Sequence, residues 1–148
     1  QIADAIYLFG EERYSRRIAR RIVERRRSDP IRTAADLASL VRSCVPRSRG
    51  HDIDPATRTF QALRIVVNGE LDNLKLALKR LPERLGAGGR IAVLSFHSLE
   101  DRIVKNAFRD DVRLNVLTRR PETPSAEEVE RNPRARSAKR RVAERNSD

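Results

Sequence analysis

The sequence has 148 residues, enough for one domain with a substantial core. Of these, 39% are hydrophobic and 36% are charged, and the formal net charge is +11. This excess of Lys and Arg favours a polyanionic partner, nucleic acid first, although a solvated arginine-rich surface is the alternative. With two Tyr, four Phe and no Trp, we expect no aromatic platform for stacked bases, so RNA contact would be mostly through phosphates.

The single cysteine and the lengths of the apolar runs indicate where the protein works. Cys44 allows no disulfide within the chain, and it lies on an apolar helical stripe, as a core thiol rather than a nucleophile. No apolar run approaches 18 residues and no secretory signal is visible, so we expect no membrane span. A cytoplasmic location is therefore predicted.

Helical spacing of apolar residues begins at once. Ile2, Ala5, Ile6 and Phe9 predict a helix that is already running, and the chain has no Met, so we interpret Gln1 as a truncation point. A basic amphipathic helix is predicted from Gly10 to about Arg27. Its buried stripe would consist of Tyr14, Ile18, Ala19, Ile22 and Val23. Its arginines would either be solvated and paired with the acidic residues Glu12 and Glu24, or bind phosphate.

Two further helices are predicted in the first part of the chain. One runs from Thr33 to Val45, where Thr33 and Asp36 approximate a capping box. A loop over residues 46–54 follows, and its His51 is interpreted as a solvent residue because no second His or Cys lies at metal spacing. A long helix then begins at Pro55 with Asp54 as its cap. Its predicted stripe is Phe60, Leu63, Val67, Leu71, Leu74, Leu78 and Leu81, and a short turn starts at Pro82.

The character of the sequence changes after the glycines at 86–89. Residues 91–94 predict a strand covered on both faces, followed by a helix with Ser98 as N-cap. Residues 112–117 alternate as a second strand, 119–136 read as a polar connection, and 137–143 predict a charged edge strand. The fold class is therefore α/β, with a helical part over residues 1–85 and a βαββ part over 86–148. Three strands make a poor sheet alone, so the second part would be the end of a larger sheet.

Four stretches of the sequence together resemble one family. They are GEERYSRRIARRIVERR at 10–26, DPATRTFQALRIVVNGEL at 54–71, GGRIAVLSFHSLEDRIVK at 88–105 and NPRARSAKRRVAER at 132–145. In this order they resemble the 16S ribosomal-RNA (cytosine-N(4)) methyltransferases, the MraW or RsmH family. The resemblance implies a class I methyltransferase (Rossmann-like) sheet interrupted by a helical insertion, the substrate-recognition domain, with this chain as the C-terminal half. The three predicted strands would be the fifth, sixth and seventh of that sheet.

The resemblance also implies an activity and its cofactor. S-adenosyl-L-methionine would supply a methyl group to the exocyclic amine of a cytidine in small-subunit ribosomal RNA. The family's glycine-rich donor loop and its acidic donor-binding residues have no counterpart here, because Gly88-Gly89 has no strand before it. We therefore expect no cofactor-binding residue in this chain, no activity from it alone and only weak, salt-sensitive RNA binding.

The candidate site residues follow the first strand of the second part. Ligands of open α/β sheets bind beyond the carboxyl ends of parallel strands, where Ser95, Phe96 and His97 lie. Ser95 and His97 would line the catalytic pocket and Phe96 would face the cytidine; alternatively, Phe96 is core and His97 only orders the turn. No metal or covalent nucleophile is required.

Four arginines are the candidate phosphate ligands, namely Arg58, Arg64, Arg134 and Arg136. Arginine offers phosphate a bidentate fork, but ion pairs with nearby carboxylates are an equal alternative for each of them. A homodimer is possible. Two other hypotheses for the chain stay open at this point: a non-catalytic RNA-binding module derived from the family, and a structural fragment that folds only with its other half.

Overall fold

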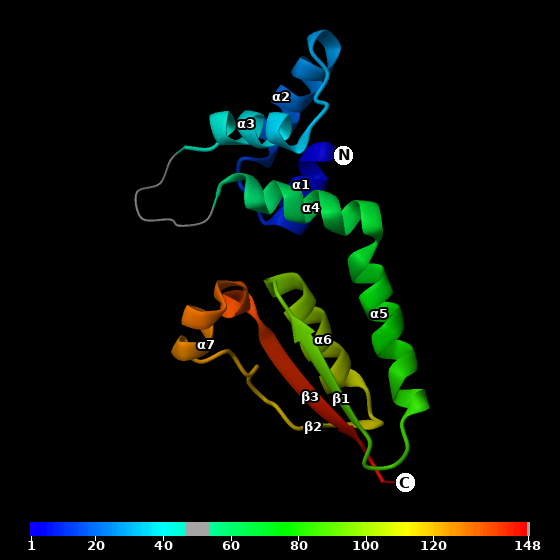
Figure 1. The fold of residues 1–148 in the computed structure, drawn as a ribbon. Coiled ribbons are helices and arrows are strands. Elements are labelled where there is room, and N and C mark those ends of the chain that lie inside the picture. Colours follow the sequence, from blue (N-terminus) through cyan, green and yellow to red (C-terminus); the bar gives the residue numbers. More distant parts are fainter. Residues whose placement is uncertain (47–53, 148) are drawn as a thin grey trace. The chain divides into compact units, whose positions relative to one another are not determined.

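A computed structural model of the chain describes residues 1–46 and 54–147 (Figure 1). The chain divides into two compact units, one ending at Glu70 and the other beginning at Leu71, and each is described by itself. The division falls before the predicted boundary at residue 85. Most of the predicted loop over 46–54, including His51, lies outside the described residues.

The described residues of the first unit form a cluster of four helices. They are α1 (Ile2–Gly10), α2 (Ser15–Ser28), α3 (Ala34–Cys44) and α4 (Ala56–Asn68). The helix predicted at the start of the chain is confirmed. The prediction that the basic helix begins at Gly10 is wrong, because Glu11 adopts a left-handed conformation (φ 50°) that ends α1. Residues 11–14 therefore form a turn, and α2 begins at Ser15.

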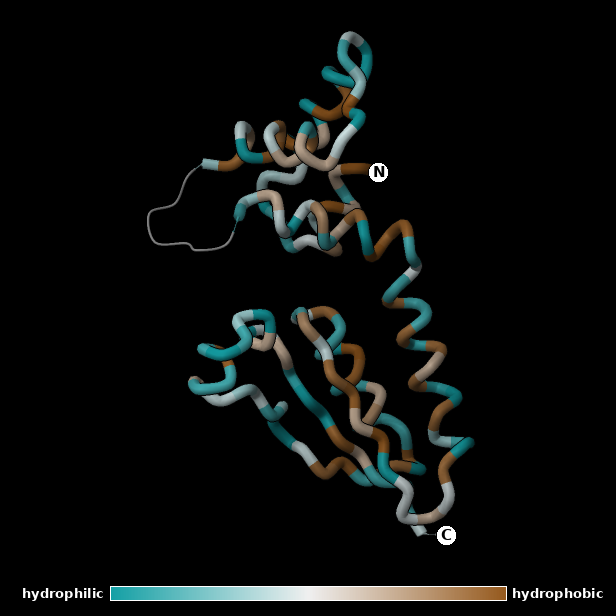
Figure 2. Tube along the Cα trace, in the orientation of Figure 1, coloured by the Kyte–Doolittle hydropathy of each residue, from teal (hydrophilic) through white to brown (hydrophobic). Residues whose placement is uncertain are grey.

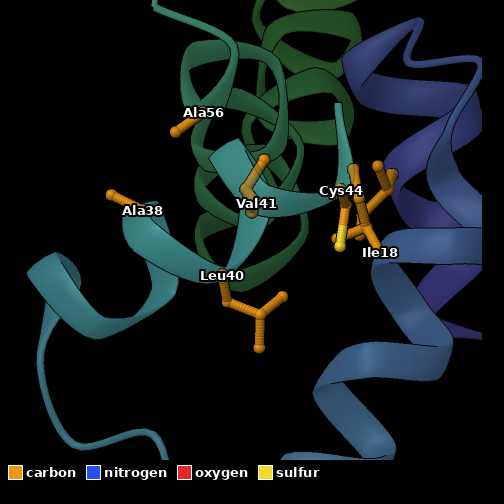
Figure 3. Close-up of a cluster of buried hydrophobic side chains, with 7 residues drawn as sticks. Ile18, Ala38, Leu40, Val41, Cys44 and Ala56 are labelled. Carbon is orange, nitrogen blue, oxygen red and sulfur yellow. The ribbon is translucent and has the colours of Figure 1, made fainter. Parts of the chain in front are cut away.

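A small apolar core holds the first unit together. Figure 3 shows Ile18 of α2 beside Cys44 of α3, with Val41 and Leu40 on the same helix and Ala56 on α4. Cys44 is almost completely buried, which confirms it as a core thiol. The predicted capping box of α3 is also confirmed: the Asp36 backbone N–H donates to Thr33 Oγ1 (3.1 Å), and the Thr33 N–H donates to Asp36 Oδ2 (3.0 Å).

The predicted long helix is in fact two helices, α4 and α5 (Glu70–Arg80). Gly69 lies between them at φ 60°, a conformation that glycine adopts without steric cost. Of the predicted stripe on α4, Phe60 packs against the core, whereas the prediction of Val67 is wrong because its side chain is 81% exposed. The fully buried residues of α4 are small or β-branched, namely Ala56, Thr59, Ala62 and Ile65. Such side chains allow α1 to approach closely: a Cβ on Gly10 would lie 2.5 Å from the Arg58 carbonyl oxygen.

The second unit is an α/β arrangement around three strands. After α5 and a 3-10 turn (Leu81–Arg84) come β1 (Arg90–Ser95), α6 (Ser98–Asp110) and β2 (Leu114–Val116). The predicted polar connection contains a short helix, α7 (Ala126–Arg131), and a second 3-10 turn, η2 (Pro133–Ser137). The last strand is β3 (Lys139–Arg145). The core contains Leu78 of α5, Ile91 of β1 and Phe108 of α6, and Figure 2 shows a hydrophobic stretch along the middle of β1.

The strand order of this sheet is β1-β3-β2, and β3 is antiparallel to both neighbours. The prediction that the last strand lies at an edge is wrong, because β3 pairs on both sides: Ala143 is opposite Ile91 of β1 and Val116 of β2. Since both outer strands run against β3, they are parallel to each other, and α6 connects them as a crossover. The prediction that β1 is covered on both faces is also wrong for the described residues, since Ala92 and Leu94 are exposed.

Candidate functional site

The turn after β1 carries the three residues predicted for the catalytic pocket. Ser95 is buried, and its hydroxyl donates to the Lys139 carbonyl oxygen at 3.3 Å, so it fastens β1 to β3. Phe96 is 49% exposed, and its backbone N–H donates to Glu100 Oε2 at 2.9 Å. The turn is therefore held at both ends while the Phe96 ring remains accessible.

His97, and not Ser98, is the N-cap of α6. Its backbone is extended, and its Nδ1 accepts the Glu100 backbone N–H at 3.3 Å, as a capping oxygen would. The prediction of Ser98 as cap is wrong, because Ser98 is already the first helical residue. An acceptor at Nδ1 puts the proton of the neutral imidazole on Nε2. Nε2 lies 3.4 Å from Glu100 Oε1, and the His97 side chain is only 8% exposed.

A groove of about 570 Å³ opens beside this turn. Its apolar wall includes Leu94 and Phe96 from the end of β1 and Pro124 from the following connection. Its polar wall includes Arg134 and Asn132. The structure thus brings together Phe96 and Arg134, which were predicted separately, in a volume typical of small-molecule sites. Arg136 lies exposed on η2 but does not line the groove.

The cations around the groove have different partners. Arg140 lines the groove and forms an ion pair with Glu122, and the two residues also exchange backbone hydrogen bonds of 2.8 and 2.9 Å. Within the described residues, Arg134 has no ion pair or side-chain hydrogen bond. Arg134 is therefore the cation of this groove whose charge is left for a ligand.

A buried ion pair supports the turn from behind. Arg141 of β3 grips Asp101 in the first turn of α6 through two hydrogen bonds, Nε to Oδ1 (2.7 Å) and Nη2 to Oδ2 (3.1 Å). The two side chains are only 7% and 13% exposed. The Arg141 hydrogen bonds hold the pKa of the Asp101 carboxyl below its ordinary value. This pair was not predicted, although Lys139, Arg141 and Ala143 alternate on one face of β3, which puts a charge among inward positions.

The other two candidate arginines belong to α4 of the first unit. Arg58 Nη1 donates to the Glu11 carbonyl oxygen at 3.4 Å, and the side chain is exposed. Arg64 Nε forms an ion pair with Glu70 Oε1 at 2.8 Å. Arg64 therefore follows the alternative that the sequence left open, an ion pair with a neighbouring carboxylate.

The glycines of the second unit have a structural role. Gly88 adopts φ 73°, and its N–H donates to the Arg145 carbonyl oxygen at 2.9 Å. The Gly89 carbonyl oxygen accepts the Arg145 N–H at 2.8 Å. These bonds extend the β1–β3 pairing toward the turn before β1. The Gly89 N–H donates within the turn, to the Gly86 carbonyl oxygen at 2.9 Å.

Comparison with known proteins places this α/β chain among the methylases. The profile of the MraW methylase family matches residues 1–146, and the chain belongs to that family. It is 61% identical over 98% of its length to Ribosomal RNA small subunit methyltransferase H of Rhodopirellula baltica, and 60% identical over 97% to the protein of that name from Synechococcus elongatus. The matches cover 45% and 48% of those two proteins, so the chain spans about half the length of these curated relatives. None of the described helices has the length and apolar character needed to cross a membrane.

Proposed function

We propose that these residues form the C-terminal, substrate-facing half of an S-adenosyl-L-methionine-dependent methyltransferase. Its substrate would be the exocyclic amine of a cytidine in small-subunit ribosomal RNA. The observation that carries the proposal is the family match over residues 1–146, together with about 60% identity to proteins named Ribosomal RNA small subunit methyltransferase H. The identities of the target base and of the methyl donor are inferred from the resemblance of the four sequence stretches. Below, the complete protein means a chain of the relatives' length that contains these residues.

The strand arrangement supports the proposed sheet. β1, β2 and β3 would be the fifth, sixth and seventh strands of a class I methyltransferase (Rossmann-like) sheet. In support, β1 and β2 are parallel and joined by a helical crossover, and β3 is antiparallel between them. Among the described strands, the outer edge of β1 has no neighbour, which leaves it available for the preceding part of such a sheet. Residues 1–85 would then be the helical insertion that recognises the substrate.

The sequence contains no motif for binding the methyl donor, so the role proposed for these residues concerns the base. Methylation of an exocyclic amine is a direct displacement that depends mainly on positioning, and no metal is required for it. Phe96 offers a flat apolar face to a cytidine that has left its stack. Arg134, in the same groove, offers a fork to the adjoining phosphate. Ser95 and His97 keep the turn in place through their bonds to Lys139 and Glu100.

A non-catalytic RNA-binding module is the second candidate. The net charge of +11 and the commitment of the Gly88–Gly89 turn to the sheet favour it. The test is to incubate the complete protein with radiolabelled S-adenosyl-L-methionine and small ribosomal subunits from cells that lack this enzyme. Label on a cytidine of the RNA supports the proposal. RNA binding without transfer, by a protein shown to be folded, would replace it with the binding module.

Two substitutions of His97 separate base contact from capping. Asn is as good an N-cap as Ser or Asp, so H97N should keep the melting temperature that H97A lowers. If His97 also touches the base, both variants of the complete protein should lose roughly ten- to a thousandfold in turnover, with donor affinity nearly unchanged. If H97N restores turnover together with stability, His97 acts only as an N-cap and is not part of the substrate site.

The two arginines of η2 provide a matched pair for the groove. Arg134 lines it and Arg136 does not, although both are exposed on the same turn. We expect R134Q to raise KM for the RNA substrate by about tenfold, the scale of one charge-assisted hydrogen bond, and R136Q to change it far less. Equal effects of the two substitutions would mean that the groove does not receive the substrate.

A further inference from the structure

Helix α2 is the most concentrated positive feature of the first unit. Its 14 residues, Ser15–Ser28, include seven arginines and one glutamate. Its apolar side is used within the unit: Ile18 and Ala19 are buried, and Ile22 packs against the core. Six of the arginines are exposed, and Arg25 is half-buried. The helix is therefore anchored by one side and presents the other as a positive surface.

The carboxylates near α2 neutralise only part of this surface. Glu24 pairs with Arg21 (3.4 Å) and Asp29 pairs with Arg25 (3.0 Å). Glu12, predicted as a partner of the arginines, is instead buried and accepts the Tyr14 backbone N–H at 2.8 Å. Within residues 1–46 and 54–147, the side chains of Arg16, Arg20 and Arg27 make no hydrogen bond or ion pair.

These last three residues form one line, here called the arginine row. At 100° per residue, Arg20 is turned by about 40° and Arg27 by about 20° from Arg16, because they follow it by four and eleven residues. Along the helix axis, at 1.5 Å per residue, Arg20 lies about 6 Å from Arg16, and Arg27 lies about 10 Å from Arg20. Like charges four residues apart disfavour a helix by a few tenths of a kcal/mol. The row therefore brings no gain to the unit itself.

We propose that the arginine row binds the phosphate backbone of the ribosomal RNA and holds it against the helical unit. This inference rests on the proposed function, which supplies RNA as the substrate. Guanidinium groups bind phosphate bidentately, and each contact releases condensed counterions from the nucleic acid. An anionic membrane is the poorer partner, because a helix lying on a membrane inserts its apolar face, and that face of α2 is buried against α1 and α3.

The test compares two triple variants of the complete protein. R16Q/R20Q/R27Q removes the row. R21Q/R25Q/R42Q removes three arginines of the same unit that already have carboxylate partners, since Arg42 grips Asp54 with Nε at 3.2 and 3.1 Å from its two oxygens. Both variants lower the net charge by the same amount, so the long-range field is matched. Kd for small-subunit ribosomal RNA is measured at several salt concentrations between roughly 50 and 200 mM.

We expect the row variant to bind RNA at least tenfold more weakly at the lowest salt. The slope of log affinity against log salt should decrease by about 2 to 3, at about one per phosphate contact. The control should change affinity less than threefold, with both variants melting near the wild type. An unchanged slope, or an equal loss in both variants, overturns the inference. So does a loss of binding to phosphatidylserine vesicles while RNA binding is retained.

The same experiment distinguishes the two proposals. If the wild-type protein transfers no methyl group to small-subunit RNA, the proposed function fails, and the Kd comparison still decides the role of the row. If the wild type is active and the row variant binds RNA as the control does, only the inference about the row fails.

Discussion

The two units use the same residue, arginine, in opposite ways. In the second unit several arginines are part of the framework. Arg141 grips Asp101 below the surface, Arg113 pairs with both Asp111 and Glu83, and Arg145 donates to the Pro82 carbonyl oxygen at 2.7 Å. In the first unit, Arg16, Arg20 and Arg27 point from α2 to solvent with no such partner among the described residues.

The difference shows that the net charge of a sequence does not say what its cations do. An arginine at an inward-facing position of a central strand, such as Arg141, is enclosed by neighbours and must find a carboxylate or carbonyl there, because an unpaired buried charge is costly. An arginine on the outer side of a helix in a four-helix cluster meets water, and its charge stays available to a partner. Substitutions of the framework arginines should therefore cost stability, and substitutions in the row should cost binding.

The largest effect is expected for Arg141. R141L leaves the Asp101 carboxylate nearly buried with Lys139 Nζ 3.9 Å away, and breaking such a pair costs about 3 kcal/mol of unfolding free energy. Urea denaturation of the complete protein measures it. R140Q is the matched control on the next residue, because its pair with Glu122 is half exposed and should contribute less than about 1 kcal/mol. Similar losses for both would contradict the distinction between framework and surface arginines.

The first unit depends on close helix approach instead. G10A places a methyl group 2.5 Å from the Arg58 carbonyl oxygen, so α1 and α4 must move apart, at a cost of about 1 to 3 kcal/mol. G86A is its control, because a Cβ there meets nothing within 4 Å. Thermal unfolding followed by circular dichroism should show a lower melting temperature for G10A alone. An unchanged G10A protein would mean that the helices are not in tight contact at this point.

Acid should remove part of what Arg141 contributes. The pKa of Asp101 in the folded protein is lowered, first by its hydrogen bonds with Arg141. A group with a lowered folded pKa stabilises above its unfolded pKa, near 3.8, and loses that contribution as the pH falls through the folded pKa. The unfolding free energy of the wild type should thus fall more steeply below about pH 4 than that of D101N. Parallel curves from pH 6 to 2 would show that Asp101 is not specially stabilised.

The smallest effect on stability is expected where binding changes most. R16Q/R20Q/R27Q removes exposed charges with no described partner, so the unfolding free energy should shift by less than about 0.5 kcal/mol per residue. Removal of like-charge repulsion makes a small gain the expected sign. A large loss would place these arginines in the framework, as in the second unit, and erase the contrast.

Features set by neighbouring residues could be predicted from the sequence. The capping box of Thr33 and Asp36 and the strand and helix on either side of Ser95–His97 depend on side chains within a few positions. The identity of the α6 cap could not, because His97 and Ser98 are adjacent polar candidates and only the backbone conformation decides between them. The break at Gly69 was visible as a glycine, but a glycine within a helix is tolerated often enough to leave both outcomes open.

Features set by pairing distant segments were beyond the sequence. A charged run at 137–143 is typical of an edge strand, yet β3 lies in the middle, where β1 and β2 both pair with it. For the same reason the groove could not be foreseen: Phe96 and Arg134 belong to segments that meet only through the pairing of β1 with β3. The sequence predicted the two residues individually, whereas the structure shows that both line one groove and that Arg136 does not.

The position of β3 has a consequence for the synthesis of this protein. A ribosome makes β1 and β2 well before residues 139–145, and during that interval neither strand of the nascent chain has the partner that both use in the folded unit. Ile91 can pair with Ala143 only after Ala143 has been synthesised, and contacts of such long sequence separation slow folding. A premature stop codon ahead of Lys139 would therefore remove β3 and, with it, the strand that pairs with both β1 and β2. The two remaining strands would have exposed edges, and the truncated chain would be a substrate for chaperones and proteases.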